Sequence, residues 1–215
     1  METTKLTKVA IWSLYLNMLC TTVSAISSYL QYDLLVGFTE GRFNESIIVQ
    51  ISETNDNREQ IIGVITLVSY FICVVVIGRW IFVSSKITHL SGADNLTISP
   101  GWSVGWYFVP ILSLWKPYQA FKQIYQVSIQ IVDWRNVSVP VSLKWWWGLW
   151  IFNSLVGQIQ FRVSMGDSSI ETLKLVSLSY VLMLPVVLLL NYIFLNILKT
   201  ISQKHNSHDF QRNLT

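Results

Sequence analysis

The sequence predicts an all-α integral membrane protein with four transmembrane helices and a re-entrant or interfacial helical hairpin between the second and the third. Three observations carry this prediction: 52% of the 215 residues are hydrophobic, only 13% are charged, and the apolar residues gather in four long runs. Soluble domains carry roughly 25% charged residues. We expect residues 1–200 to form a single membrane-embedded helical domain and residues 201–215 to form a polar cytoplasmic tail.

The first predicted span covers residues 9–30, and its polar residues recur every three or four positions. On a helix this spacing places them in one stripe, which predicts close packing against another helix or, alternatively, the lining of a polar pathway. A cleavable signal peptide is a further alternative, but the apolar run is long enough to remain as a helix. The stripe consists of Ser13, Asn17, Thr21, Ser24 and Ser28.

Residues 31–60 carry six acidic residues and two arginines, and we expect them to form a polar loop. Three further apolar runs predict spans over residues 61–83, 145–161 and 173–197. Pro185 lies near the middle of the last run, where it can kink the helix while neighbouring groups satisfy the freed carbonyl.

The segment 100–131 is also apolar, but it is short and broken. A helix from Trp102 to Trp115 has fourteen residues, which gives about 21 Å of length against a hydrocarbon core of about 30 Å. Pro110 interrupts even this stretch. We therefore expect a re-entrant or interfacial hairpin over residues 100–131 instead of a fifth span.

Local signals divide this hairpin into two helices. Ser99 is a good N-cap and Pro100 suits the first turn of a helix that ends near Val109, because Pro110 disfavours a helical residue before it. Pro117 can start a second helix, which is predicted to be amphipathic and interfacial. Its expected apolar face consists of Tyr118, Phe121, Tyr125 and Ile129, and its expected polar face of Lys122, Gln123 and Gln126.

The distribution of positive charge distinguishes four spans from five. Positive residues accumulate on the cytoplasmic side of short loops. If the hairpin does not cross, eleven of the 15 lysines and arginines lie inside and four outside; if it crosses, six lie inside and nine outside. The four-span arrangement also places all ten tryptophans in or near the inner leaflet, at the interface that this side chain prefers. Both tests predict four spans with the N- and C-termini in the cytoplasm.

The hairpin carries a motif that resembles a family of bacterial membrane proteins, the domain of unknown function DUF4328. The resemblance implies a helical, multi-pass membrane protein with no established activity, and it places the chain in a bacterial inner (plasma) membrane. The later Lys-Trp-Trp-Trp-Gly-Leu-Trp sequence also fits the family, and the likeness extends over residues 60–200. The motif comprises Pro100 and Trp102, then Trp106 to Pro110 with two further aromatic residues between, then Trp115, Pro117 and Tyr118.

One catalytic motif occurs in the sequence, and its context argues against catalysis. Gly101 to Gly105 read Gly-Trp-Ser-Val-Gly, which matches the nucleophile elbow of hydrolases, but no predicted strand precedes Ser103. We interpret the match as accidental and expect the two glycines to allow close helix packing. We expect no enzyme activity, no cofactor and no metal site, and no Asp or Glu lies inside any predicted span.

Polar residues within the spans suggest a layer just below the membrane midplane. Arg79 is the one strong charge near a span interior, and snorkelling to inner-leaflet phosphates is its simpler interpretation. We estimate the depth of each polar residue by counting 1.5 Å per residue from the inner end of its span. Four residues then lie within about one helical turn of the same depth, and the hairpin could dock there. The hypothetical layer consists of Asn17, Arg79, Asn153 and Asn191.

Three functions are compatible with these features. The first is a structural or accessory membrane protein that assembles with copies of itself or with a partner protein. The second is a small-solute transporter or channel subunit gated by the re-entrant segment. The third is binding of inner-leaflet lipid, with anionic head groups held by basic residues and tryptophans. The lipid bilayer is the expected partner in all three, and we expect no nucleic acid.

Overall fold

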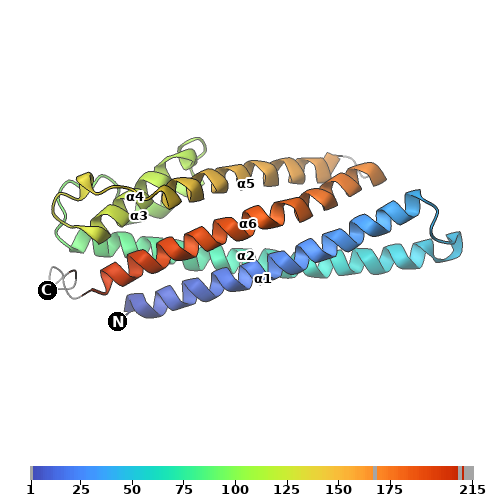
Figure 1. Cartoon of the computed structure of the whole chain (residues 1–215), viewed down its shortest axis with the longest axis horizontal. Helices are drawn as coiled ribbons and strands as arrows, with labels where there is room; N and C mark the ends of the chain where they lie inside the picture. The colour runs from blue at the N-terminus through green and yellow to red at the C-terminus, as the bar shows by residue number, and fades with distance from the viewer. Residues whose placement is uncertain (1, 167–168, 208–209, 211–215) are drawn as a thin grey trace. The chain divides into compact units, whose positions relative to one another are not determined.

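The computed structural model describes residues 2–166, 169–207 and 210, and every regular element in this part of the chain is a helix. The predicted all-α fold class is therefore confirmed for the described residues. Four long helices alternate with short connections, except between the second and third, where the hairpin lies (Figure 1). The elements in order are α1 (Glu2–Thr39), α2 (Glu45–Leu90), α3 (Pro100–Gly105), η1 (Trp106–Phe108), η2 (Leu112–Leu114), α4 (Lys116–Ile129), η3 (Trp134–Asn136), α5 (Val141–Gly166) and α6 (Ile170–His205).

Three of these helices are long and apolar enough to cross a membrane, namely α1, α2 and α6. They contain the predicted spans 9–30, 61–83 and 173–197. The predicted span 145–161 lies inside α5, which has 26 residues. Tryptophans, Asn153 and two glutamines lower the mean hydropathy of α5, and the helix does not reach the same apolar standard as the other three.

The prediction of a polar loop over residues 31–60 is wrong. Helix α1 continues to Thr39 and α2 already begins at Glu45, so the connection is only a few residues long. The segment contains no proline, and polar residues such as Gln and Glu are good helix formers. The break occurs at Gly41, whose φ of +67° ends α1. The N–H of Arg42 donates to the carbonyl of Gly37 at 2.9 Å, as in a Schellman C-cap.

The polar stripe of α1 is buried, as expected for a packing face. Ser13 and Ser28 are buried and the three residues between them in the stripe are partly buried. On the other side of the helix, Trp12 and Leu19 are strongly exposed. Apolar residues therefore face outward on this helix, which is the arrangement that a lipid environment allows.

The chain forms two compact units, each built from separate parts of the sequence. Unit 1 comprises Met1–Leu14, Ile72–Gly148 and Asn191–Thr215, and it includes the hairpin. Unit 2 comprises Tyr15–Phe71 and Leu149–Leu190. Nine of the ten tryptophans belong to unit 1, and four of them, Trp80, Trp134, Trp146 and Trp147, are buried.

The end of α6 extends into the predicted polar tail. Residues 201–205 are helical, and Ile201 and His205 are buried in unit 1. The ring of His205 lies 4.9 Å from the ring of Phe210, measured between centroids. The first part of the tail thus contributes to the packing of unit 1.

Candidate functional site

The candidate site is the hairpin formed by α3, η1, η2 and α4, in which the sequence motif is concentrated. The two limbs run antiparallel within unit 1, with their turn at residues 106–115 (Figure 1). Ser99 occupies the N-cap of α3 with extended backbone angles, although its side chain makes no capping hydrogen bond. Pro117 lies in the first turn of α4, as predicted. The motif prolines therefore mark the start of each limb.

The first limb carries an aromatic stack. The rings of Trp102 and Trp106 are stacked with their centroids 4.3 Å apart. The ammonium of Lys116, at the start of the second limb, lies 5.8 Å from the centroid of the Trp106 ring. Such a position allows a cation–π attraction. The limb approaches α2 closely at Gly78. A Cβ atom placed on this glycine would lie 3.7 Å from the side chain of Val104 in the limb.

Pro110 breaks the hairpin between its two limbs. The residue after it, Ile111, has φ 66° and ψ −55°, and the Leu112 N–H donates to the carbonyl of Pro110 at 2.7 Å. The Ser113 N–H donates to the carbonyl of Val109 at 2.9 Å. The turn is thus held by its own backbone hydrogen bonds.

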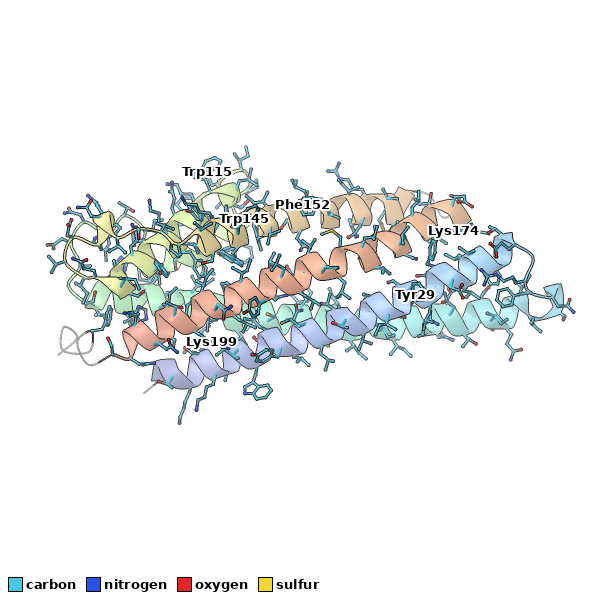
Figure 2. All side chains as sticks on the ribbon, in the orientation of Figure 1. Tyr29, Trp115, Trp145, Phe152, Lys174 and Lys199 are labelled. Atoms are coloured by element: carbon cyan, nitrogen blue, oxygen red, sulfur yellow. The ribbon has the colours of Figure 1, made fainter. Side chains whose placement is uncertain are left out.

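The remaining motif residues surround Trp147 of α5. The indole N–H of Trp147 donates to the carbonyl of Leu114 at 2.9 Å, and rings of Tyr107 and Tyr118 lie within 6.5 Å of its ring. Burial raises the pKa of both phenols above the ordinary value for tyrosine. Trp115 itself is exposed at the turn, where it projects away from the helices (Figure 2).

Phe121 anchors the second limb, helix α4, to the long helices of unit 1. This side chain is completely buried, and its ring contacts rings from three other helices. The centroid distances are 6.3 Å to Trp80 of α2, 4.9 Å to Trp146 of α5 and 5.6 Å to Phe194 of α6. Because α4 is the only element in this cluster that belongs to the hairpin, Phe121 couples the hairpin to the long helices.

The prediction of an exposed polar face on α4 is wrong at two positions, because Gln123 and Gln126 are buried. The Gln123 carbonyl oxygen accepts hydrogen bonds from the Thr97 N–H and hydroxyl, both at 3.0 Å, and its amide donates to the carbonyl of Ile98 at 3.2 Å. The Gln126 amide donates to the carbonyl of Val137 at 2.7 Å. Both glutamines therefore satisfy backbone groups of the irregular segments on either side of the hairpin.

The burial of Gln123 and Gln126 could have been predicted from the smaller apolar residues near them in the sequence. Ala120, Ile124 and Val127 are buried and follow helical spacing around Gln123. The aromatic residues Tyr118 and Tyr125 are only partly buried. The face that packs inward is thus rotated away from the aromatic face predicted from the sequence.

The nucleophile-elbow letters do not form an elbow. Ser103 is completely buried in α3, and its hydroxyl donates to the carbonyl of Pro100 at 2.6 Å. The expectation that both glycines permit close helix packing is also wrong. A side chain at Gly101 would meet open space, and one at Gly105 would meet the ring of Trp102 from the same helix.

The hypothetical polar layer is divided between the two units. In unit 1, Arg79 is exposed whereas Asn191 is buried. In unit 2, Asn17 and Asn153 are both partly buried. The exposure of Arg79 agrees with snorkelling to head groups, and the layer itself stays a prediction.

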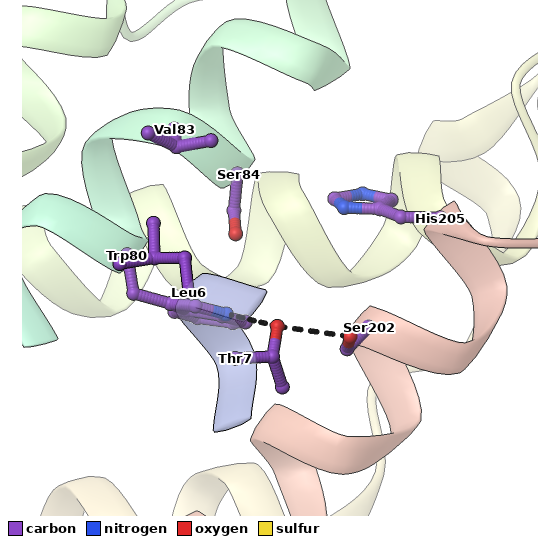
Figure 3. A pocket seen from close by; sticks show the side chains of 7 residues that line it. All are labelled: Leu6, Thr7, Trp80, Val83, Ser84, Ser202 and His205. Atoms are coloured by element: carbon purple, nitrogen blue, oxygen red, sulfur yellow. Dashed lines mark hydrogen bonds between the residues drawn. The ribbon is translucent and has the colours of Figure 1, made fainter. Parts of the chain in front are cut away.

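A small buried cavity in unit 1 was not predicted from the sequence. The Thr7 hydroxyl accepts hydrogen bonds from the Trp80 indole N–H at 3.0 Å and from the Ser202 hydroxyl at 2.9 Å (Figure 3). The three residues connect α1, α2 and α6 around it. The lining residues are Leu6, Thr7, Trp80, Val83, Ser84, Ser202 and His205.

Unit 2 contains a charged cluster that was also not predicted. The Arg58 guanidinium of α2 donates to the Ser27 hydroxyl of α1 at 3.0 Å and to the Asn55 side chain at 2.6 Å. It also pairs with the neighbouring Glu59 at 3.3 Å. No group of three or more metal-ligating side chains occurs among the described residues.

Comparison with protein-family models gives a match over residues 44–203 to the family described as Domain of unknown function (DUF4328). The match covers well over half of the chain and the whole hairpin. It confirms the resemblance expected from the proline and tryptophan motif. A search of curated proteins and a search of solved structures each found no similar protein.

Proposed function

The chain belongs to the DUF4328 family, and we propose that it is a structural or accessory membrane protein that assembles with copies of itself or with a partner protein. It acts without catalysis, in the inner (plasma) membrane of a bacterium. The observation that carries this proposal is the use of the hairpin's buried polar groups. Gln123 and Gln126 hold backbone of the chain itself, so these two buried side chains act as a scaffold and are not available to a substrate.

The proposed topology has four spans, with both termini in the cytoplasm. The length of α5 supports a fourth span, because its 26 residues give about 39 Å of helix against a hydrocarbon core of about 30 Å. The excess of basic residues on the proposed inner side supports the same arrangement.

The hairpin is proposed to re-enter the membrane from the cytoplasmic side to a shallow depth. Trp147, which contacts the turn at Leu114, lies six residues beyond Val141, the start of α5. This position corresponds to about 9 Å along the helix axis. A depth of about 5–10 Å is typical of elements that rest at the boundary of head groups and acyl chains.

The proposal that the protein is not an enzyme draws support from Ser103. A nucleophilic serine must reach its substrate and a general base. The Ser103 hydroxyl is buried and bonded to a carbonyl of its own helix.

Solute transport is a second candidate, favoured by buried polar groups in unit 2. The Ser69 hydroxyl of α2 is buried and has no hydrogen-bond partner within the described part of the chain. Ser28 of the α1 stripe adds a further buried hydroxyl in unit 2. Such groups also occur where water enters a membrane protein.

Reconstitution distinguishes the two candidates. The purified protein in proteoliposomes should give no flux of ions or small neutral solutes above empty vesicles, and in native membranes it should migrate as an assembly larger than one chain. Flux that Ser69→Ala reduces would contradict the structural proposal and support transport. Migration as a single chain without flux would contradict assembly.

A further inference from the structure

The turn of the hairpin contains a conformation that proteins rarely adopt. Ile111 has φ 66° and ψ −55°, and the hydrogen bond from Leu112 N–H to Pro110 O, at 2.7 Å, spans this single residue. The angles and the bond define a classic γ-turn, which is rare and strained. Isoleucine is an unusual residue for it, because positive φ disfavours a β-branched side chain. Strained residues of this kind concentrate at functional positions.

Two large apolar side chains near the γ-turn are strongly exposed. Phe108 is 77% exposed and Ile111 is 71% exposed. They lie two residues before and one residue after Pro110, in the segment that connects the two limbs, which we call the tip. The carbonyls of Val109, Pro110 and Ile111 accept backbone hydrogen bonds, and the carbonyl of Leu114 accepts one from the Trp147 indole. Pairing of backbone groups within the protein is a condition for placing irregular structure at membrane depth.

Behind the tip lies a collar of aromatic rings with one cation. Trp102 and Trp106 are stacked, and the Lys116 ammonium lies over Trp106. The hairpin thus carries exposed apolar side chains at Phe108 and Ile111 and an aromatic and cationic cluster at Trp102, Trp106 and Lys116. A phospholipid offers matching groups, since its acyl chains and its phosphate flank the interfacial region that tryptophan prefers.

The charge of the hairpin also matches an anionic leaflet. Residues 95–132 contain two lysines, Lys116 and Lys122, and no acidic residue. A second copy of the chain would present the same positive charge in a symmetric contact. Two exposed side chains also offer far less area than the roughly 800 Å² that a stable protein interface covers on each partner.

We propose that the tip is a phospholipid-binding site of the inner leaflet. Phe108 and Ile111 lie among acyl chains, and the Lys116 ammonium binds the phosphate of an anionic phospholipid. The inference rests on the proposed cytoplasmic re-entry of the hairpin and adds its ligand and the residues that bind it.

Spin labels on the full-length protein in nanodiscs containing phosphatidylglycerol test the acyl-chain contact. With Cys20 and Cys73 replaced by alanine, single cysteines are placed at Phe108, Ile111 and Val132. Val132 is the matched control, because it is apolar and 79% exposed but lies beyond the other end of α4. Labels at Phe108 and Ile111 should collide with oxygen and not with a water-soluble nickel chelate, and the label at Val132 should show the reverse.

The possible outcomes distinguish a failure of this inference from a failure of the proposed topology on which it rests. Nickel collisions at Phe108 and Ile111 equal to those at Val132 would place the tip in water and overturn the inference. Low collision with both reagents would mean that a protein surface covers the tip, which also overturns it. If an impermeant thiol reagent reaches Val132 only from outside intact cells, the proposed topology fails as well.

A charge variant tests the phosphate contact. Lys116→Gln should reduce phosphatidylglycerol retained on the purified protein, measured by native mass spectrometry, by about fivefold, on the scale of one lysine at an anionic surface. Lys122→Gln is the matched control on the exposed side of the same helix, and it should retain lipid like the unmodified protein. Equal losses in both variants, or none in Lys116→Gln, would overturn the assignment of Lys116.

Discussion

Unit 1 holds nine of the ten tryptophans and all of the irregular backbone between α2 and α5, whereas unit 2 holds one tryptophan and long helices. Their hydrogen bonds differ accordingly. In unit 1, long-range bonds run from side chains such as Gln123, Gln126 and Trp147 to backbone carbonyls, in addition to side-chain bonds between helices such as that from Trp80 to Thr7. In unit 2 they join side chains of different helices, as between Gln160 and Ser179 or Ser177 and Gln31.

The difference follows from where backbone groups are left unpaired. A helix satisfies its own N–H and carbonyl groups except at its ends, so unit 2 needs few side-chain partners for its backbone. The turns around the hairpin leave carbonyls open, and in a membrane such groups need partners within the protein. The comparison teaches that unit 1 uses part of its polar residues to support irregular backbone, whereas the polar residues of unit 2 mainly connect regular helices.

The largest expected effect is the loss of the aromatic anchor in unit 1. Phe121→Ala should lower the free energy of unfolding by about 3–5 kcal/mol, because it empties a fully buried site between three helices. Unfolding in mixed micelles, followed by circular dichroism, measures the change. Phe152→Ala in unit 2, where the ring is exposed, should change it by no more than about 0.5 kcal/mol. Equal losses in the two units would remove the distinction between them.

The next effect concerns the backbone partners of the hairpin. Gln123→Leu keeps the size of the side chain but leaves the Thr97 N–H and the Ile98 carbonyl without it, which should cost about 1–3 kcal/mol. Gln119→Leu, on the exposed side of the same helix, is the control. Faster amide hydrogen exchange at Thr97 should accompany the loss in the first variant alone. An unchanged exchange rate would show that Gln123 does not hold this backbone.

The sequence predicted the helical class, the three long apolar helices α1, α2 and α6, and the limits of the hairpin limbs, because these depend on local signals. Apolar runs mark spans, and Pro100, Pro110 and Pro117 mark the starts and the break of the two limbs. The loop over residues 31–60 was predicted wrongly, because polarity alone does not end a helix. The actual signal was Gly41, which adopts a left-handed conformation.

The site was less predictable, because its key contacts depend on tertiary structure. Gln123 and Gln126 look like solvent-facing residues until the open carbonyls of residues 98 and 137 lie beside them. The γ-turn at Ile111 violates the preference of isoleucine, so no propensity could have indicated it. The motif of prolines and tryptophans located the hairpin, but it did not distinguish the residues that anchor it from those at its tip.

A smaller effect is expected for the charged cluster of unit 2. The Arg58 side chain is 34% exposed, so its pairing is screened by solvent. Arg58→Met should cost about 1 kcal/mol through the lost bonds to Ser27 and Asn55. Arg42→Met, which removes an exposed pair with Asp33 and Glu40, should have almost no effect in the same unfolding measurement. A loss above that of Gln123→Leu would mean that unit 2 depends more on polar contacts than unit 1.

Cysteine accessibility scanning of residues 100–118 in intact cells tests the central claim, that the hairpin enters from the cytoplasmic side and returns. We predict that an impermeant thiol reagent added outside labels none of these positions. Added to inverted membrane vesicles, the same reagent should label the residues near 100 and leave the tip at Phe108 and Ile111 unlabelled. Labelling of any position in this segment from outside intact cells would contradict the re-entrant arrangement and the four-span topology with it.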